Sequence, residues 1–121
     1  KELGAYFAEV NRHTLLMPQC ETAEALEHIE EIAALDGVDG IFVGPYDLSV
    51  ALGTPAAFAA AEFRQALDRV LRACRAHGKP AFIYANTMAE ARDRFAQGYR
   101  GAAVGTDTAF LVKAIQGMLQ S

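Results

Sequence analysis

The chain has 121 residues, of which 52% are hydrophobic and 21% charged, and its formal net charge is −4. This length and composition predict one ordinary globular domain and exclude an intrinsically disordered chain. The negative charge argues against a basic face for nucleic acid or anionic lipid.

No apolar run reaches the roughly 18–20 residues of a membrane span, and no stretch has the pattern of a signal peptide. The two cysteines, Cys20 and Cys74, have neither the number nor the spacing of a disulfide framework or a metal site. We therefore expect a reduced, cytoplasmic protein. Because the chain starts at Lys1 within an apparent helix, we also expect it to be part of a longer polypeptide.

The first half of the chain alternates helical and extended patterns. Residues 1 to about 11 have apolar residues at helical spacing, and residues 14–20 form an apolar run of strand length in which Pro18 argues against a helix. Thr22 offers an N-cap for a second helix, which Asp36-Gly37 ends. The apolar stripe of this helix is Ala25, Leu26, Ile29, Ile32 and Ala33. Residues 40–43 form a second strand, and we expect residues 44–55 to be a long loop.

The second half continues the alternation. A long helix is predicted by apolar residues at the spacings i, i+3, i+4, i+7, i+8 and i+11, namely Phe63, Ala66, Leu67, Val70, Leu71 and Cys74. Gly78 ends this helix, and residues 81–85 form a third strand. Residues 87–90 have the pattern of a capping box for the next helix, whose inner face we expect to hold Met88, Ala91 and Phe95. Residues 101–105 form a fourth strand. Residues 106–108 cap a last helix, for which an inward stripe is expected at Phe110, Leu111, Ala114, Ile115 and Met118.

The resulting order, β-α-β-α-β-α-β-α, predicts an α/β fold with a parallel sheet and right-handed crossovers. Two architectures fit four such units. One is an open, doubly wound sheet of flavodoxin type. The other is half of a (β/α)₈ barrel, which takes about 250 residues when complete. The pattern of elements alone leaves this choice open.

Two carboxylates follow strand ends. Glu21 comes directly after the first predicted strand, and Asp47 comes a few residues after the second. Because loops at the carboxyl ends of parallel strands meet on one face, the two side chains can share a divalent cation such as Mg²⁺ or Mn²⁺. The alternative is that each carboxylate caps a helix and favours its dipole. The pairing on one rim favours the metal hypothesis.

Other residues near these strand ends suit a substrate site. Gln19 lies two residues before Glu21 and so points to the same side of a strand, where its amide can bind a substrate oxygen or be satisfied by neighbouring backbone. Gly44-Pro45 permits close approach of a ligand and leaves the N–H groups of Tyr46 and Asp47 available, although a plain turn would have the same sequence.

Other polar residues have simpler explanations. The segment Gly105-Thr106-Asp107 could bind an anion at a helix N-terminus, but an N-cap is the simpler interpretation. The three histidines, His13, His28 and His77, are predicted to be surface residues. Cys20 and Cys74 are predicted to be buried small hydrophobes.

Three segments together resemble a known family. They are residues 17–22 (Met-Pro-Gln-Cys-Glu-Thr), residues 37–49, which end in Gly-Pro-Tyr-Asp-Leu-Ser, and residues 103–108 (Ala-Val-Gly-Thr-Asp-Thr). They resemble the class II, metal-dependent pyruvate aldolases, the 4-hydroxy-2-oxoheptanedioate and 2-dehydro-3-deoxyglucarate aldolases of the phosphoenolpyruvate/pyruvate barrel superfamily. The resemblance covers nearly all of the chain after about residue 13. Family members usually have an aliphatic residue at the position of Cys20 and alanine at that of Tyr46, so Tyr46 could narrow the site or alter the aldehyde preference.

The resemblance implies a fold and a reaction. Residues 1–121 would be a single partial domain, the C-terminal half of a TIM (β/α)₈ barrel with its strands five to eight. The enzyme would cleave or form 4-hydroxy-2-oxo acids, to or from pyruvate and an aldehyde, through a metal-stabilised pyruvate enolate. The resemblance further implies a homo-oligomer, with the last helix packed on a neighbouring subunit, and small molecules rather than nucleic acid or membrane as partners.

The resemblance also assigns residues. Glu21 and Asp47 would bind the divalent metal, Mg²⁺, Mn²⁺ or Co²⁺. The substrate would contact Gln19, Gly44, Pro45, Tyr46 and Asp47. The family's histidine base and arginine lie in its N-terminal half, so no catalytic residue is expected within these 121 residues, and the chain alone is expected to be inactive.

A second hypothesis is a non-catalytic, flavodoxin-like α/β regulatory domain that binds Mg²⁺. A receiver domain of this kind needs a lysine after its last strand, but here that strand ends in Val104-Gly105-Thr106. If the chain is instead a half-barrel, its edge strands and inward faces need a cover. We then expect it not to persist as a well-folded monomer without its N-terminal half or a second copy.

Overall fold

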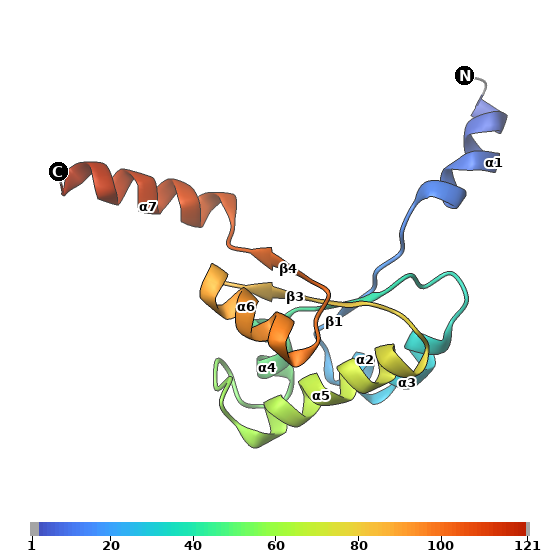
Figure 1. Cartoon of the computed structure of the whole chain (residues 1–121), viewed down its shortest axis with the longest axis horizontal. Helices are drawn as coiled ribbons and strands as arrows, with labels where there is room; N and C mark the ends of the chain where they lie inside the picture. Colours follow the sequence, from blue (N-terminus) through green and yellow to red (C-terminus); the bar gives the residue numbers. More distant parts are fainter. Residues whose placement is uncertain (1–2, 121) are drawn as a thin grey trace.

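The computed structural model describes residues 3–120 as an α/β fold built on one parallel sheet (Figure 1). Its strands are β1 (Gln19–Cys20), β2 (Ile41–Val43), β3 (Ala81–Ala85) and β4 (Gly101–Val104). Its helices are α1 (Leu3–His13), α2 (Ala23–Glu27), α3 (Ile29–Ala34), α4 (Pro45–Ala51), α5 (Ala61–Ala76), α6 (Met88–Gln97) and α7 (Asp107–Leu119). No helix in this described part is long and apolar enough to cross a membrane.

The sheet has the strand order β1-β2-β3-β4, and every neighbouring pair is parallel. A doubly wound sheet would reverse its strand order at a switch point. The consecutive order is instead that of successive units of a (β/α)₈ barrel, as expected from the resemblance. The strands are in close register, with Cys20 beside Val43 and Val43 beside Ile83, so their carboxyl ends lie along one edge.

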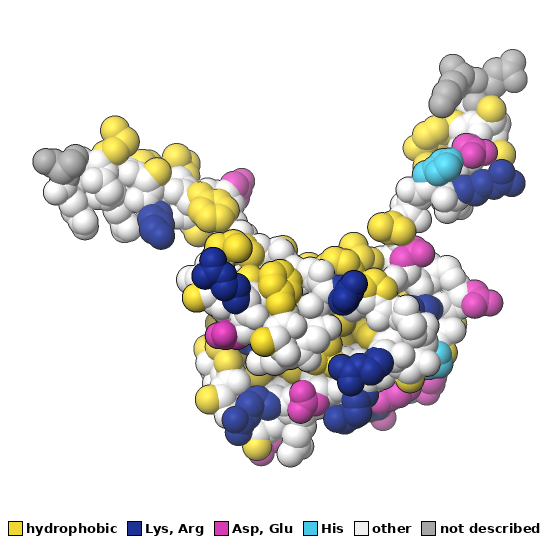
Figure 2. Space-filling view, in the orientation of Figure 1, with side chains coloured by type: hydrophobic (Ala, Val, Ile, Leu, Met, Phe, Trp, Pro, Cys, Tyr) yellow, Lys and Arg dark blue, Asp and Glu magenta, His cyan; other side chains and the backbone are white. Residues whose placement is uncertain are grey.

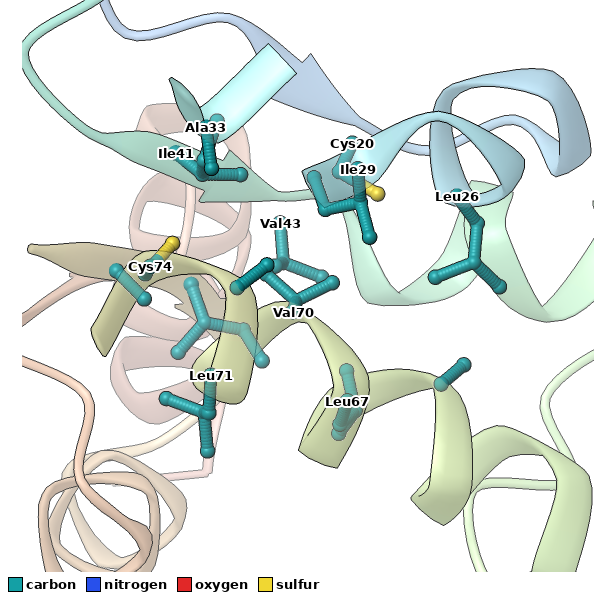
Figure 3. Packing of buried hydrophobic residues seen from close by; sticks show 14 of the residues in the cluster. Cys20, Leu26, Ile29, Ala33, Ile41, Val43, Leu67, Val70, Leu71 and Cys74 are labelled. Atoms are coloured by element: carbon teal, nitrogen blue, oxygen red, sulfur yellow. The ribbon is translucent and has the colours of Figure 1, made fainter. Parts of the chain in front are cut away.

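The core lies between the sheet and the helices α3 and α5. Figure 3 shows buried side chains from β1, β2 and α5 pointing toward one another. The helical stripe predicted for α5 is confirmed, since all six of its residues are buried: Phe63, Ala66, Leu67, Val70, Leu71 and Cys74. Alternation along β2 and β3 buries Ile41, Val43 and Ile83 on the same side. Both cysteines are buried and all three histidines are exposed, as predicted.

Three helices begin at a predicted threonine cap. The hydroxyls of Thr22, Thr87 and Thr106 accept hydrogen bonds from the backbone N–H groups three residues later, at 3.0, 3.1 and 3.2 Å. The capping box at Thr87 differs in one respect, because Glu90 accepts from the N–H of Asn86 rather than from that of the cap residue. Gly98 closes α6 with φ of 115°, a conformation that favours glycine.

The strand predicted over residues 14–20 is wrong in extent, since β1 has only two residues. Pro18 has no N–H to donate to a ladder, and β1 has β2 as its one neighbour among the described strands. The segment before it still runs beside β2, because Asp39 N donates to Leu16 O at 2.8 Å and Phe42 N donates to Pro18 O at 3.0 Å. Leu16 itself is exposed.

The loop predicted over residues 44–55 is also wrong in its first part, which forms α4. Pro45 is the reason, because a proline at the first helical position has the required φ and loses no helical hydrogen bond. The predicted helix after Thr22 is interrupted where His28 leaves the helical region, with φ of −101° and ψ of 18°. Residues 1 and 2 of the first predicted helix lie outside the described residues.

The terminal helices α1 and α7 extend away from the sheet, and neither has a buried residue (Figure 1). The prediction that the apolar stripe of α7 faces inward is therefore wrong for this chain. Beyond β4 the described residues contain no further strand, so α7 has no sheet surface on which to pack. The inner face predicted for α6 is confirmed only at Ala91, since Met88 and Phe95 are exposed.

Candidate functional site

The candidate site lies where β1 and β2 end. Cys20 pairs with Val43, and the backbone N–H of Gly44 donates to Cys20 O at 3.3 Å. The parallel pairing therefore brings Glu21, the residue after β1, alongside Gly44, the residue after β2. In parallel α/β folds this is the edge at which binding sites form.

Gln19 and Glu21 lie on the same side, as the two-residue period of a strand predicts. The Gln19 Nε2 atom donates to Glu21 Oε2 at 2.5 Å. Both side chains lie against Gly44, because a Cβ atom on residue 44 would be 2.7 Å from Glu21 Oε2 and 2.8 Å from Gln19 Nε2. Glycine at this position thus provides the space that the carboxylate and the amide occupy. The backbone of Gly44 itself is extended, with φ of −93°, so sterics rather than backbone conformation require glycine.

Helix α4 carries the remaining predicted residues. Pro45 occupies the first helical position, and Tyr46 and Asp47 follow in the first turn. The N–H groups of a first turn have no partner within the helix and are open to a ligand. The side chain of Tyr46 is exposed (58%), so it is free to extend over the edge of the sheet.

The structure separates the two explanations for the carboxylates. Thr22, and not Glu21, caps α2, so helix capping does not account for Glu21. Asp47 lies in the first turn of α4, where its negative charge favours the helix dipole whether or not a ligand is bound. Glu21 is therefore the carboxylate with the clearer functional signal.

Ser49 supports this site, a role that its sequence pattern does not predict. It is completely buried, its Oγ donates to Tyr46 O at 2.6 Å, and the same atom accepts from Ala56 N at 2.9 Å. Ala56 has φ of 58°, which is uncommon for a residue other than glycine. Ser49 thus ties the loop after α4 to the turn that carries Tyr46 and Asp47. The signal in the sequence is the serine that follows Tyr46 by three residues in the Gly-Pro-x-Asp-Leu-Ser segment.

The donor set suits a hard cation. Carboxylate oxygens are the ligands that Mg²⁺ and Mn²⁺ prefer, and Mg²⁺ commonly takes one or two carboxylates and keeps water and substrate oxygens in its other positions. Within residues 3–120 no group of three or more His, Cys, Asp or Glu side chains could hold a metal ion. A cation here would therefore depend on the pair Glu21 and Asp47 with further oxygen ligands.

The other polar candidates lie outside this site. At the start of α7, Thr106 acts as the N-cap, and the aromatic ring of Phe110 lies against Gly105, which supports the capping interpretation. His13 and His28 are both exposed. His13 pairs with Glu9 of α1, and His28 pairs with Glu31 of α3. Burial raises the pKa of the Cys20 thiol to about 11, so this residue of β1 is not a nucleophile.

The chain as a whole matches a known protein family. The family model described as HpcH/HpaI aldolase/citrate lyase matches residues 2–114. The 5-keto-4-deoxy-D-glucarate aldolase of Shigella dysenteriae serotype 1 (strain Sd197) is 38% identical over 111 residues, which are 92% of this chain and 43% of that enzyme.

Two solved structures are also similar. An HpcH/HpaI aldolase/citrate lyase family protein from Burkholderia cenocepacia J2315 superposes with a TM-score of 0.88 and 35% identity, over 95% of this chain and 45% of that protein. CitE from Mycobacterium tuberculosis, solved in complex with magnesium, acetoacetate and coenzyme A, gives a TM-score of 0.63 and 25% identity, over 82% of this chain and 43% of CitE. The chain thus spans less than half the length of each of these relatives.

Proposed function

The chain belongs to the HpcH/HpaI aldolase/citrate lyase family, and we propose that it forms the metal-binding half of a class II aldolase. The complete enzyme would cleave 4-hydroxy-2-oxo acids to pyruvate and an aldehyde, or form them by the reverse reaction. The curated relative from Shigella dysenteriae is named as an aldolase, and this chain spans 43% of it. The activity is therefore proposed for a protein in which these four βα units complete a barrel.

One observation carries this proposal. The side chains of Gln19 and Glu21 converge on Gly44 at the carboxyl ends of two adjacent parallel strands, and Asp47 follows in the next turn. A family resemblance alone would predict the residue types. The convergence of an amide and a carboxylate on a glycine supports the proposal further, because the amide can bind a substrate oxygen and the carboxylate a cation.

We assign separate roles to these residues. Glu21 and Asp47 would hold a divalent cation, as the magnesium in the related CitE suggests, and when bound this cation would stabilise negative charge on the oxygens of a 2-oxo acid. The Gln19 amide orients the Glu21 carboxylate and can bind a substrate oxygen. The free N–H groups of the first turn of α4, at Tyr46 and Asp47, suit a substrate carboxylate. The exposed Tyr46 ring would limit the size of the aldehyde.

The proton-transfer groups are proposed to come from outside this chain. The nearest basic residues before β1, Arg12 and His13, are exposed on α1 and pair with Glu9, so neither reaches the site. By the family resemblance, the general base and a charge-stabilising arginine belong to the other four βα units of the barrel. The 121-residue chain alone would then bind metal without turning over substrate.

The test uses the full-length native protein. With Mg²⁺ or Mn²⁺ and a 4-hydroxy-2-oxo acid it should release pyruvate, and exhaustive chelation should stop the release until metal is added back. Asp47→Asn should abolish the release. Glu24→Gln is the matched control. Glu24 is an exposed acid in the first turn of α2, so this change removes only a charge that favours the helix dipole. Pyruvate release that survives chelation would refute the metal dependence.

We also propose that the complete enzyme is an oligomer. Helix α7 exposes a stripe of large apolar side chains, including Phe110 (59% exposed), Leu111 and Ile115. Figure 2 shows apolar side chains along both projecting helices. Exposed apolar area of this kind needs a protein surface to cover it. Sedimentation of the full-length protein should therefore show an oligomer. A full-length protein that sediments as a monomer would refute this proposal.

A further inference from the structure

A cavity lies at the amino ends of the strands, on the opposite side of the sheet from the candidate site. It has a volume of about 480 Å³ and lies beside the C-terminal ends of α5 and α6. Ala81, the first residue of β3, lines it, as do Gly98 and Arg100 just before β4. The cavity is thus at the amino ends of the strands, whereas Glu21 and Gly44 follow their carboxyl ends.

The charged residues of this cavity are all cationic. Arg75, Lys79 and Arg100 line it, and none of the aspartates or glutamates among residues 3–120 does. The Nζ atom of Lys79 donates to Leu35 O at 2.5 Å, which leaves two of its three N–H donors unused. Among the described residues, the guanidinium groups of Arg75 and Arg100 have neither a hydrogen bond nor an ion pair. Basic side chains lie on the face that carries α5 and the segment entering β4 (Figure 2).

The positions of the two arginines also matter. Arg75 extends from α5 toward the end of α6, because a Cβ atom on Gly98 would lie 3.4 Å from Arg75 Nη2. Arg100 follows Gly98 by two residues and lines the same cavity. The two guanidinium groups therefore reach one space from different helices and loops, despite being 25 positions apart in the chain.

Helix dipoles offer a simpler explanation, because cations near helix C-termini are stabilising. Backbone N–H groups already bind two carbonyls in the last turn of each helix. His77 and Lys79 donate to Cys74 O, Gly78 to Arg75 O, Tyr99 to Arg94 O, and Gly98 to Phe95 O. The guanidinium donors remain available for another acceptor.

We propose that this cavity binds a small, multiply charged oxyanion, of the phosphate or polycarboxylate class. Arginine presents parallel N–H donors that match the oxygens of a phosphate or carboxylate, and Lys79 adds a further positive charge. The net charge of −4 and the confinement of these cations to one cavity favour a small ligand over a nucleic acid. The site is separate from the proposed aldolase chemistry and does not depend on it.

The experiment is calorimetric titration of the full-length, metal-free protein with inorganic phosphate and, separately, with tricarballylate. Chloride is adjusted to keep the ionic strength constant. We expect saturable binding of one ion per chain. Arg75→Gln with Arg100→Gln should weaken it at least about tenfold, the effect of losing charge-assisted hydrogen bonds. Arg100→Lys should give a smaller loss, because it keeps the charge without the planar fork.

Two variants serve as controls. Arg64→Gln removes an exposed arginine of α5 that does not line the cavity, and it should leave the affinity unchanged. Asp47→Asn should also bind the anion normally, which separates this site from the aldolase site. The tighter of the two probes identifies the ligand class. Non-saturable binding, no binding of either anion, or an equal loss in Arg64→Gln would overturn the proposal. Circular dichroism confirms that each variant is folded.

Discussion

Replacing Gly44 with alanine should damage the candidate site without unfolding the protein. The new Cβ would lie 2.7 Å from Glu21 Oε2, so the carboxylate must retreat by about 0.7 Å to reach ordinary van der Waals contact at 3.4 Å. It would also lie 2.8 Å from Gln19 Nε2 and displace that amide. A displaced ligand and a lost orienting hydrogen bond should lower metal affinity about 10–100-fold, or about 1.4–2.8 kcal/mol.

The effect on stability should be small. Gly44 has φ of −93° and ψ of 92°, which alanine adopts without strain, and two of the three nearest atoms are the ends of side chains. The third, Glu21 Cβ at 3.2 Å, has to give by only a few tenths of an ångström. The free energy of unfolding should therefore change by less than about 1 kcal/mol.

The assay pairs urea unfolding with Mn²⁺ titration in the full-length protein. Gly117→Ala is the matched control, because a Cβ atom there meets nothing within 4 Å, and its metal affinity should equal that of the wild type. Wild-type metal affinity in Gly44→Ala would refute the reasoning, since it would mean that Glu21 does not bind the ion from this position.

Three further predictions concern stability. Ser49→Ala should lower the free energy of unfolding by roughly 1–3 kcal/mol in urea titrations, because it leaves Ala56 N–H without its buried acceptor; an unchanged midpoint would contradict this. Tyr99→Phe should raise it by about 1 kcal/mol, because the buried Tyr99 hydroxyl has no hydrogen-bond partner among the described residues; a clear loss would reveal one. A hydrogen bond from Arg69 lowers the pKa of Glu30 from 4.5 to about 2. The stabilisation that this carboxylate gives the folded state is therefore fully present above pH 4.5 and is lost as the pH falls toward 2. Glu30→Gln should thus be less stable than the wild type at pH 7 and approach it at pH 2, whereas a constant difference would contradict this linkage.

Features set by local sequence could be predicted. The buried stripe of α5 follows from helical spacing, and the caps at Thr22, Thr87 and Thr106 follow from side-chain chemistry within one turn. Gln19 and Glu21 point to the same side because side chains along a strand alternate with a period of two residues. Each of these depends on residues close together in the chain.

Other features depend on distant partners or on a choice between local conformations. Pro45 suits a turn and a first helical position equally well, so the sequence predicts a loop where α4 forms. The apolar run before Cys20 has the length of a strand, but Pro18 limits its pairing in the ladder, so β1 has only two residues. An amphipathic pattern in α7 shows that a cover is needed but not which surface supplies it. The role of Ser49 depends on a loop that returns seven residues later to Ala56.

The most direct test of the central claim is the affinity of the full-length protein for Mn²⁺ when each proposed ligand is changed. We predict that Glu21→Gln and Asp47→Asn each weaken binding at least about tenfold, while the first-turn control Glu24→Gln binds as the wild type does. The variants should remain folded, because Glu21 is only half-buried and Asp47 is exposed. Wild-type affinity in both ligand variants would contradict the assignment of the metal to this pair of strand ends.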